Sequence, residues 1–444
     1  MHIEIPKHVE MILNVLEEAG FEAYAVGGCV RDVLLGRCPH DWDITTSALP
    51  EQVKELFHRT IDTGLQHGTV TVMVEKEGYE VTTYRVDGEY EDGRHPKEVT
   101  FTASLSEDLK RRDFTINAMA YNHTDGLVDL FGGKEDLENG IIRCVGDPME
   151  RFTEDALRIM RAVRFSAQLG FAIEEKTKAA LPIIAPNLKN VSAERIEAEL
   201  EKMLLSPNPD FLRVAYEAGI TKEFLWEFDT CMKTPQNNPH HCFSVGEHIL
   251  HSMLYVKADK VLRFAMLLHD IGKPQVKSTD EDGIDHFYNH AIVGEKMAKT
   301  IMRRLKMDND TIYKVSKLIQ FHDYWGIMNA KQVRKTINKI GEDLFPLLLE
   351  IKKADCLAQS DLTRKENLTC LVEAQKHFQE IQERNECVSL KTLAITGNDL
   401  IQLGMKPGKE IGIILHKLLD LVLEEPEKNT KECLLKAIAD IKMN

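Results

Sequence analysis

The spacing of apolar residues changes near residues 147–148, and this change constrains the fold more than any other feature of the sequence. Before it, segments 69–75 and 79–85 alternate apolar and polar residues, with a glycine-containing turn between them. This pattern predicts a β-hairpin. After it, apolar residues recur at helical spacing, as at Phe152, Leu157, Met160, Val163 and Ala167. The chain is therefore predicted to be an α+β protein, with strands in its N-terminal part and helices in the remainder.

The composition is that of an ordinary globular protein. The 444 residues suffice for about three domains, and 43% of them are hydrophobic and 29% charged. No apolar run approaches the roughly 20 residues that span a bilayer. The nine cysteines form no Cys-x-x-Cys pair, and the N-terminus lacks the apolar stretch of a signal peptide, so we expect a cytoplasmic protein without a membrane partner. The net charge of −15 argues against indiscriminate nucleic-acid binding, but the basic run at residues 301–340 is compatible with binding one structured RNA.

Two aspartates one residue apart, Asp41 and Asp43, follow a double glycine at residues 27–28. Strand side chains alternate faces, so the two carboxylates would point the same way and could share two divalent cations. The glycines let the backbone approach a phosphate. An isolated Asp-x-Asp is most often a turn or a solvated strand end. Three further features favour phosphoryl or nucleotidyl transfer with two Mg²⁺ ions. They are Glu80, the basic segment 111–117 and Arg31.

Four segments resemble the class II tRNA nucleotidyltransferases, the CCA-adding enzymes, whose superfamily includes the bacterial poly(A) polymerases. They are Gly27–Asp32, Asp41–Asp43, Arg111–Ala118 and Arg151–Arg158. The resemblance covers roughly residues 20 to 205. It implies a catalytic head with a small mixed sheet, followed by helical neck, body and tail regions. It also implies template-independent addition of C, C and A to the 3′ end of tRNA, with CTP and ATP as substrates.

The same resemblance implies roles for individual residues. Asp41 and Asp43 would hold the Mg²⁺ ions, and Glu80 matches a third acid found in some relatives. Asp113 would contact the ribose, while Arg31 and Arg112 would face the triphosphate. The residues expected to bind the nucleotide are Gly27, Gly28, Arg31, Arg112, Asp113, Asn117, Glu154, Asp155, Arg158 and Arg161.

Asp155 and Arg158 are expected to read the base. Residues three apart are neighbours on a helix, so the two would present an acceptor and a forked donor side by side. Cytosine and adenine each offer an amine beside a ring acceptor, whereas uracil and guanine reverse that order. Mispaired buried polar groups cost about 1–3 kcal/mol each, so the couple would accept C and A. Glu154 would orient Arg158. Without the resemblance, an ordinary surface ion pair would be the better interpretation.

Segment 85–96 is polar and contains glycines, and it is predicted to be a mobile loop. By resemblance, the enzymes of this family that add only CC lack such a loop. Its presence therefore favours either full CCA addition or addition of the terminal A alone.

A second constellation of residues lies around the sequence Leu267-Leu-His269-Asp270-Ile-Gly-Lys273. Imidazole and carboxylate groups spread over helices suit one or two divalent cations. Their order resembles that of the HD phosphohydrolases, which implies hydrolysis of phosphate esters at RNA ends, with Lys273 neutralising the phosphate. The expected metal ligands are His248, His269, Asp270, His290, His322 and Asp355. Two alternatives stay open: exchange with His241, His251 or His286, and histidines that only cap helices or pack.

These assignments predict four regions. They are a nucleotidyltransferase head (1–143), a helical neck that recognises base and RNA (144–233), an HD-like phosphohydrolase domain (234–365) and a tRNA-binding helical tail (366–444). The alternatives to CCA addition are an A-adding tRNA nucleotidyltransferase and a poly(A) polymerase. A hypothesis of another class is an HD phosphohydrolase with an inactive, RNA-binding head. The sequence leaves the oligomeric state open.

Overall fold

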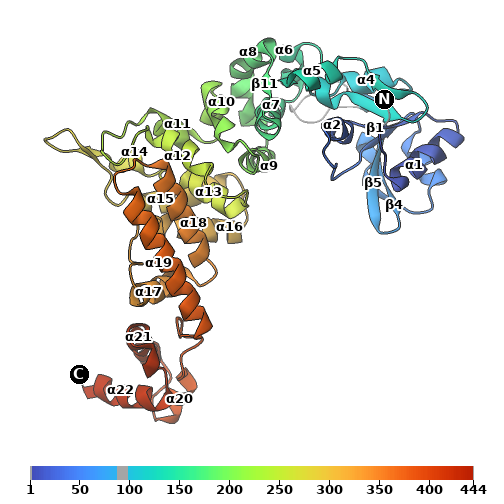
Figure 1. The fold of residues 1–444 in the computed structure, drawn as a ribbon. Helices are drawn as coiled ribbons and strands as arrows, with labels where there is room; N and C mark the ends of the chain where they lie inside the picture. Colours follow the sequence, from blue (N-terminus) through green and yellow to red (C-terminus); the bar gives the residue numbers. More distant parts are fainter. Residues whose placement is uncertain (1–2, 88–98, 444) are drawn as a thin grey trace. The chain divides into compact units, whose positions relative to one another are not determined.

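The computed structural model describes residues 3–87 and 99–443, and the chain divides into two compact units, residues 1–226 and 227–444 (Figure 1). The first unit contains a large sheet with helices, and the second unit is almost entirely helical. The predicted α+β class is therefore confirmed. Among the described residues, no helix has both the length and the apolar content that crossing a membrane requires.

A seven-stranded mixed sheet forms the centre of the first unit, in the order β3-β4-β5-β2-β1-β8-β9. β2 and β5 run parallel, and the other neighbouring pairs are antiparallel. The strands are β1 (Ala23–Val26), β2 (Ile44–Thr46), β3 (Thr60–Gly64), β4 (Thr69–Val74), β5 (Glu77–Thr83), β8 (Met119–Asn122) and β9 (Gly126–Asp129).

The predicted hairpin is present as β4 and β5. Its turn is shorter than predicted and consists of Glu75 and Lys76, because Val74 already pairs with Glu77. Glu75 has a left-handed φ of 55°, as tight hairpin turns require. Of the predicted loop, Arg85–Asp87 forms β6, which pairs with β7 (Val99–Phe101). Residues 88–96 of that loop lie outside the described part of the chain.

Helices cover the sheet and continue beyond it to the end of the first unit (Figure 1). Apolar residues of α1, including Val9, Ile12 and Leu16, pack with strand residues such as Ile44 and Val81 in one buried cluster. The helices are α1 (Lys7–Glu18), α2 (Gly28–Leu34), α3 (Pro50–Leu56), α4 (Leu105–Lys110), α5 (Gly133–Asn139), α6 (Pro148–Glu154), α7 (Leu157–Leu169), α8 (Glu175–Ile184), α9 (Ala193–Leu204) and α10 (Leu212–Glu217). The remaining strand pair is β10 (Ile141–Ile142) with β11 (Ala172–Ile173).

The second unit is built from helices whose first turns are often capped by a Ser, Asp or Asn side chain, as at Ser244, Asp259 and Asp308. Its helices are α11 (Trp226–Lys233), α12 (Val245–Met253), α13 (Lys260–Leu268), α14 (Lys273–Val276), α15 (His290–Arg304), α16 (Asn309–Phe321), α17 (Ala330–Ile340), α18 (Phe345–Ala358), α19 (Arg364–Glu383), α20 (Gly397–Gln402), α21 (Lys409–Glu424) and α22 (Lys431–Met443). One small hairpin, β12 (Ser278–Thr279) with β13 (Asp285–His286), interrupts them.

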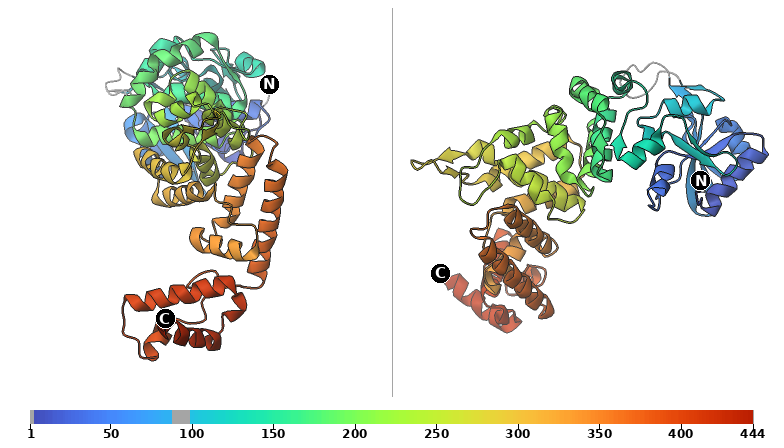
Figure 2. Two further views of the ribbon diagram at one scale, coloured as in Figure 1. Left: turned by 90° about the vertical axis from the view of Figure 1, so that its left-hand side faces the viewer. Right: turned by 45° about the horizontal axis from the view of Figure 1, so that its top comes forward.

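Within the second unit, the long helix α19 packs along α18, and both are drawn in orange in Figure 2. The last three helices, α20 to α22, share a buried cluster that includes Leu400, Leu418 and Leu434. Arg334 of α17 attaches this cluster to the rest of the unit, because it donates to the backbone oxygen of Leu423 at 2.9 Å.

Candidate functional sites

A polar cavity of about 500 Å³ lies in the first unit, and we call it the arginine cavity because seven of its lining residues are arginines. Its lining consists of Gly27, Gly28, Arg31, Asp43, Arg111, Arg112, Asp113, Asn117, Asp155, Leu157, Arg158, Arg161, Arg164, Phe165 and Arg195. The structure thus gathers every predicted nucleotide-binding residue except Glu154 around one cavity. Such a concentration of guanidinium groups suits a polyanion such as a triphosphate.

Gly27 allows the backbone to turn beside this cavity. Its φ of +80° is one that glycine adopts without strain, and α2 begins at the next residue. A Cβ at residue 27 would lie 3.1 Å from Nη1 of Arg112. Any other residue would therefore combine backbone strain with displacement of Arg112.

Asp108 anchors two arginines of the cavity, although the sequence did not single it out. Its buried carboxylate lies 2.7 Å from Nη2 of Arg111 and 3.2 Å from Nη2 of Arg112. Desolvation opposes ionisation of this carboxyl, but Arg112 and Arg111 outweigh it and lower the pKa of Asp108 below its ordinary value. Asp108 is therefore an ionised counterion that holds both arginines in place.

Asp113 is also held by protein donors. Its Oδ2 accepts a hydrogen bond from Nε of Arg161 at 2.7 Å, and its Oδ1 accepts from Asn117 at 3.1 Å and from the backbone of Phe114 at 2.8 Å. Desolvation opposes ionisation, but Arg161 and the hydrogen bond from Asn117 lower the pKa of Asp113 to about 2. The carboxylate thus orients Arg161 in the cavity, and its contact with a ribose stays a prediction.

Asp155 and Arg158 do not lie on one helix, and this part of the prediction is wrong. α6 ends at Glu154 and α7 begins at Leu157, while Asp155 has an extended backbone (φ −140°, ψ 102°). The reason is local, because Oδ1 of Asp155 accepts a hydrogen bond from the backbone nitrogen of Leu157 at 3.1 Å. Aspartate side chains compete with helical hydrogen bonding in this way. Both residues nevertheless line the arginine cavity.

Each member of this couple has an oppositely charged partner. Oδ2 of Asp155 lies 2.7 Å from Nη2 of Arg195 on α9. Nη1 of Arg158 donates to Glu154 at 2.6 Å and to the backbone oxygen of Arg151 at 2.8 Å. The expected contact between Glu154 and Arg158 is therefore present. Arg195 escaped sequence reasoning because it is one of several charged residues on an amphipathic helix.

A second cavity of the first unit, about 770 Å³, adjoins the three predicted catalytic acids, and we call it the carboxylate cavity. It is lined by Pro6, His40, Asp41, Trp42, Asp43, Glu77, Gly78, Tyr79 and Glu80. Trp42 packs against the core of the sheet, so Asp41 and Asp43 on either side of it are exposed. The predicted alternation thus holds, although β2 begins only at Ile44. Because Ile44 pairs with Val81 in the parallel ladder, Asp43 lies level with Glu80.

The electrostatics of the carboxylate cavity suit a cation. The pKa of Asp43 is raised by desolvation and by Asp41, although Arg112 opposes the shift. The pKa of Glu80 is raised by desolvation, by Asp43 and by Asp41. Negative groups held this close favour a divalent metal, and carboxylate oxygens are its preferred ligands. Asp43 lines both cavities, so the acids adjoin the arginines.

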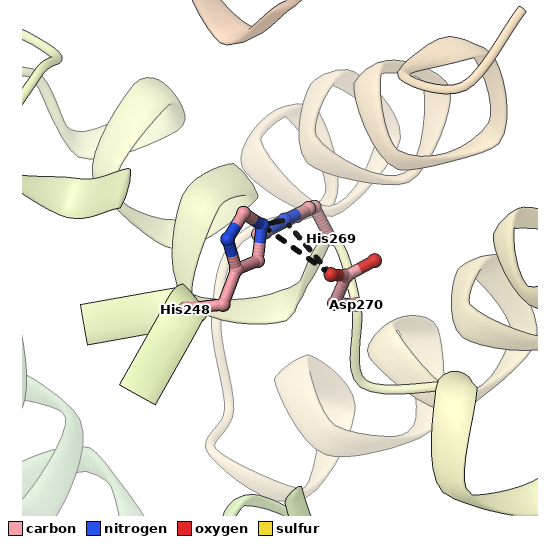
Figure 3. Close-up of side chains that lie close together, drawn as sticks. All are labelled: His248, His269 and Asp270. Atoms are coloured by element: carbon pink, nitrogen blue, oxygen red, sulfur yellow. Dashed lines mark hydrogen bonds and ion pairs between the residues drawn. The ribbon is translucent and has the colours of Figure 1, made fainter. Parts of the chain in front are cut away.

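In the second unit, the six residues predicted as metal ligands come together from five helical segments in one group, which we call the histidine cluster. His248 and His269 approach each other with 3.2 Å between their Nε2 atoms, and Figure 3 shows both beside Asp270. Nε2 of His290 lies 3.1 Å from Nε2 of His322. The remaining predicted ligand, Asp355, has Oδ1 at 2.9 Å from Nε2 of His248.

Hydrogen bonds to backbone carbonyls determine which ring nitrogen of three cluster histidines carries the proton and which carries a lone pair. Nδ1 of His269, His290 and His322 lies 2.7, 2.8 and 2.7 Å, respectively, from a backbone carbonyl oxygen. A carbonyl only accepts, so each Nδ1 carries a proton and each neutral ring presents a lone pair at Nε2. Facing Nε2 lone pairs repel each other unless a cation or a proton lies with them. The donor set therefore fits a divalent cation.

Asp270 belongs to two overlapping groups of ligand atoms. One consists of His248, His269 and Asp270, the other of Asp270, His290 and His322, and in each group the atoms lie within 4.8 Å of one another. Asp270 would therefore supply a carboxylate ligand to a divalent cation bound in either group. Lys273 lies 2.7 Å from its Oδ2, so this lysine is paired within the cluster instead of being held free for a phosphate.

Two of the three alternative histidines take other partners. His251 stacks on Phe243, with 4.2 Å between the ring centroids. His286 makes a 2.7 Å contact with Asp280. Only His241 lies next to the cluster, where its ring centroid is 5.4 Å from that of His248. Exchange of ligands with His251 or His286 is thus excluded in this structure.

Three family models match the chain. Residues 23–143 match the Poly A polymerase head domain. Residues 170–232 match a model described as an RNA- and SrmB-binding site of polymerase A. Residues 278–438 match domain 2 of the tRNA nucleotidyltransferases. Together these models account for segments of both units.

Curated relatives match over nearly the full length. The chain is 38% identical to the CCA-adding enzyme of Levilactobacillus brevis over 445 residues, which covers 98% of this chain and 99% of that enzyme. It is 39% identical to the CCA-adding enzyme of Lactobacillus helveticus, with 97% of this chain and 96% of that one covered. A shorter match, 61% identical over 194 residues, is to the CCA-adding enzyme of Leuconostoc mesenteroides, where it covers 44% of this chain and only 48% of that enzyme.

Solved structures agree with this similarity. The crystal structure of the Bacillus stearothermophilus CCA-adding enzyme in complex with CTP matches with a TM-score of 0.73 at 29% identity, and covers 99% of this chain and 100% of that one. The Thermotoga maritima CCA-adding enzyme complexed with tRNA matches with a TM-score of 0.59 at 22% identity over 99% of this chain and 100% of that one, which supports the fold.

Proposed function

Because the chain belongs to the family of CCA-adding enzymes, we propose that it adds C, C and A to the 3′ end of tRNA, with CTP and ATP as substrates. The observation that carries this proposal is the junction of the two cavities of the first unit at Asp43, which lines both. A nucleoside triphosphate held by the arginines would have its phosphates next to the exposed carboxylates.

We propose that Asp41, Asp43 and Glu80 hold two Mg²⁺ ions in the carboxylate cavity. The raised pKa values of Asp43 and Glu80 support this, because like charges are kept close together there. When bound, such ions would activate the 3′-hydroxyl of the RNA and stabilise the pyrophosphate leaving group. No protein general base is required.

The protein groups around the nucleotide have separate tasks. Arg31, Arg112 and Arg161 would bind the triphosphate, and their acidic partners keep them in the cavity without closing it. Asp155 would accept from the exocyclic amine of C or A, and Arg158 would donate to the neighbouring ring nitrogen. Uracil and guanine would place an acceptor opposite the Asp155 carboxylate and a donor opposite the Arg158 guanidinium, at a cost of about 1–3 kcal/mol for each mispaired group.

Three RNA substrates test the reaction: tRNA that ends before CCA, tRNA that ends before the final A, and an unrelated RNA, each with CTP or ATP. We expect C on the first, A on the second and no long tail on the third. Failure to incorporate C would indicate an A-adding enzyme, and long A tails on unrelated RNA a poly(A) polymerase. Asp43→Ala should abolish addition with tRNA binding retained, whereas Asp62→Ala, at an exposed ion pair with Lys54 in the same head, should leave addition unchanged.

We also propose that the histidine cluster holds one or two divalent cations and hydrolyses phosphate esters at RNA ends. The convergent Nε2 lone pairs and the shared Asp270 support this second function. When bound, the cation would lower the pKa of an attacking water. Elemental analysis should show less bound divalent metal per protein in His269→Ala than in the wild type, because the head of the variant would still hold Mg²⁺. Hydrolysis of a 2′,3′-cyclic phosphate that persists in His269→Ala would contradict the site assignment.

The variants Asp43→Ala and His269→Ala distinguish a nucleotidyltransferase from a phosphohydrolase whose head is inactive. If Asp43→Ala loses C and A addition while His269→Ala retains it, the head is the transferase.

We further propose that the predicted regions 1–143, 144–233, 234–365 and 366–444 are the head, neck, HD-like domain and tRNA-binding tail. The nine cysteines are all unpaired, which suits a reducing compartment and supports a cytoplasmic location.

A further inference from the structure

One aromatic ring lies against three guanidinium groups of the arginine cavity. The Cζ atoms of Arg31, Arg161 and Arg164 lie 5.1, 5.4 and 3.8 Å, respectively, from the ring centroid of Phe165. Phe165 is buried, and it packs edge to face against Phe114 with 5.7 Å between the ring centroids. A cation within about 6 Å of an aromatic centroid is attracted by the negative face of the ring.

The three arginines would otherwise repel one another. Arg161 and Arg164 are three apart on α7, which places them on one face of that helix, and Arg31 approaches from α2. Each has its own acidic partner, in the pairs Arg31–Asp32, Arg161–Asp113 and Arg164–Glu199. Each of these acids pairs mainly with one arginine, whereas the ring of Phe165 meets all three. The ring is therefore the common surface on which the three cations converge.

We propose that Phe165 is a positioning residue for the nucleoside triphosphate, because its π face holds these three arginines in the cavity before the nucleotide arrives. The inference rests on the proposed function, since it assigns the arginine cavity to the triphosphate. Preorganised cations bind an anion more tightly because they need not be gathered during binding. An aliphatic residue could fill the volume of Phe165, but it lacks the ring quadrupole that attracts a cation.

Ring fluorination tests this role, because fluorine weakens the negative face of the ring and changes its volume little. Phe165 would be replaced by phenylalanines carrying one, two and three fluorines. We expect the KM for CTP and for ATP, and the Kd for CTP by titration calorimetry, to rise stepwise to about 10-fold for the trifluoro ring. kcat and the preference for C and A over U and G should stay nearly constant. KM and Kd values that do not change along the fluorinated series would overturn the proposal. A fall in kcat of similar size without a change in KM would also overturn it.

A matched control uses Phe345, which is fully buried against Phe378 in the second unit, with 5.2 Å between the ring centroids. The same fluorinated residues at this position should leave both KM values unchanged. Phe165→Leu, checked for folding by circular dichroism, should reproduce the KM of the trifluoro ring.

The proposed function and this inference fail differently. Wild-type protein that binds CTP but adds no nucleotide would refute the transferase function, and the Kd series would still decide the role of Phe165. Wild-type protein that binds no CTP would refute both. Normal addition combined with a flat Kd series would refute the role of Phe165 alone.

Discussion

Nη2 of Arg195 lies 2.7 Å from Oδ2 of Asp155, and this ion pair joins segments 40 residues apart in the chain. Arg158 is held in a similar way by Glu154 at 2.6 Å. Each member of the couple proposed to read the base is thus oriented by a charge of opposite sign. In addition, Nη1 of Arg195 is buried and has no hydrogen-bond partner in the described residues. The proposed recognition of C and A would therefore depend on at least four side chains instead of two.

Replacing Arg195 by Gln should relax the choice of base before it stops the chemistry. Without the guanidinium, Asp155 loses its fixed orientation, and the penalty on mispaired U and G falls. We expect misincorporation of U and G relative to C to rise about 10-fold, equivalent to ~1.4 kcal/mol. The measurement is kcat/KM for each of the four nucleotides. Arg143→Gln, which breaks a partly exposed pair with Asp136, serves as control. An equal loss for all four nucleotides in Arg195→Gln would indicate a structural role only.

Asp113 should stabilise the fold in a pH-dependent way. Its folded pKa is about 2, against 3.8 ordinarily. The unfolded chain therefore binds more protons between these values, so the contribution of Asp113 is complete above about pH 4 and is lost as the pH falls through 2. Asp113→Asn should lower the free energy of unfolding by about 2 kcal/mol at pH 7. Below pH 4, the difference in this free energy between the wild type and the variant should become smaller. Urea denaturation across this pH range measures it, and a constant difference would contradict the assignment.

Asp43 should be costly to stability in the absence of metal. The pKa of Asp43 is raised in the folded protein, so between its ordinary pKa and this raised pKa the folded chain binds more protons than the unfolded chain. The free energy of unfolding therefore falls as the pH rises through this range. With a chelator present at pH 7, Asp43→Asn should be more stable than the wild type by less than about 1 kcal/mol, because the carboxylate is exposed and screened. Mg²⁺ should stabilise the wild type more than it stabilises the variant. Thermal unfolding with EDTA or Mg²⁺ measures both effects, and a variant less stable than the wild type in EDTA would refute the prediction.

Removal of metal from the histidine cluster should destabilise the protein. A cation that binds only the folded state adds about 2.7 kcal/mol at a concentration 100-fold above its Kd. A chelator should therefore lower the Tm of the wild type by more than it lowers the Tm of His269→Ala, in which only the head would still bind metal. His251→Ala is a suitable control, because that ring stacks on Phe243 outside the cluster. A chelator effect of equal size in His269→Ala and in the wild type would argue against a metal at this site.

Features that depend on a residue type and its immediate neighbours were predictable from the sequence. The alternation of Asp41, Trp42 and Asp43 placed one side chain against the core and two carboxylates outside it, and the hairpin of β4 and β5 followed from its β-branched residues. The same reasoning failed at Asp155, where helical periodicity continues but the aspartate side chain accepts a hydrogen bond from the backbone amide of Leu157, two residues on, and the helix is interrupted.

Packing of distant segments accounts for the rest. The chemistry of histidine and aspartate suggested a metal site, but the convergence of their Nε2 and carboxylate atoms depends on how five helical segments of the second unit cross. Likewise, no local pattern predicts that Arg195 would meet Asp155 or that Phe165 would gather three arginines. Such contacts join residues far apart in the chain, so their distances follow from the geometry of packed helices and strands, which residue order and propensity do not specify.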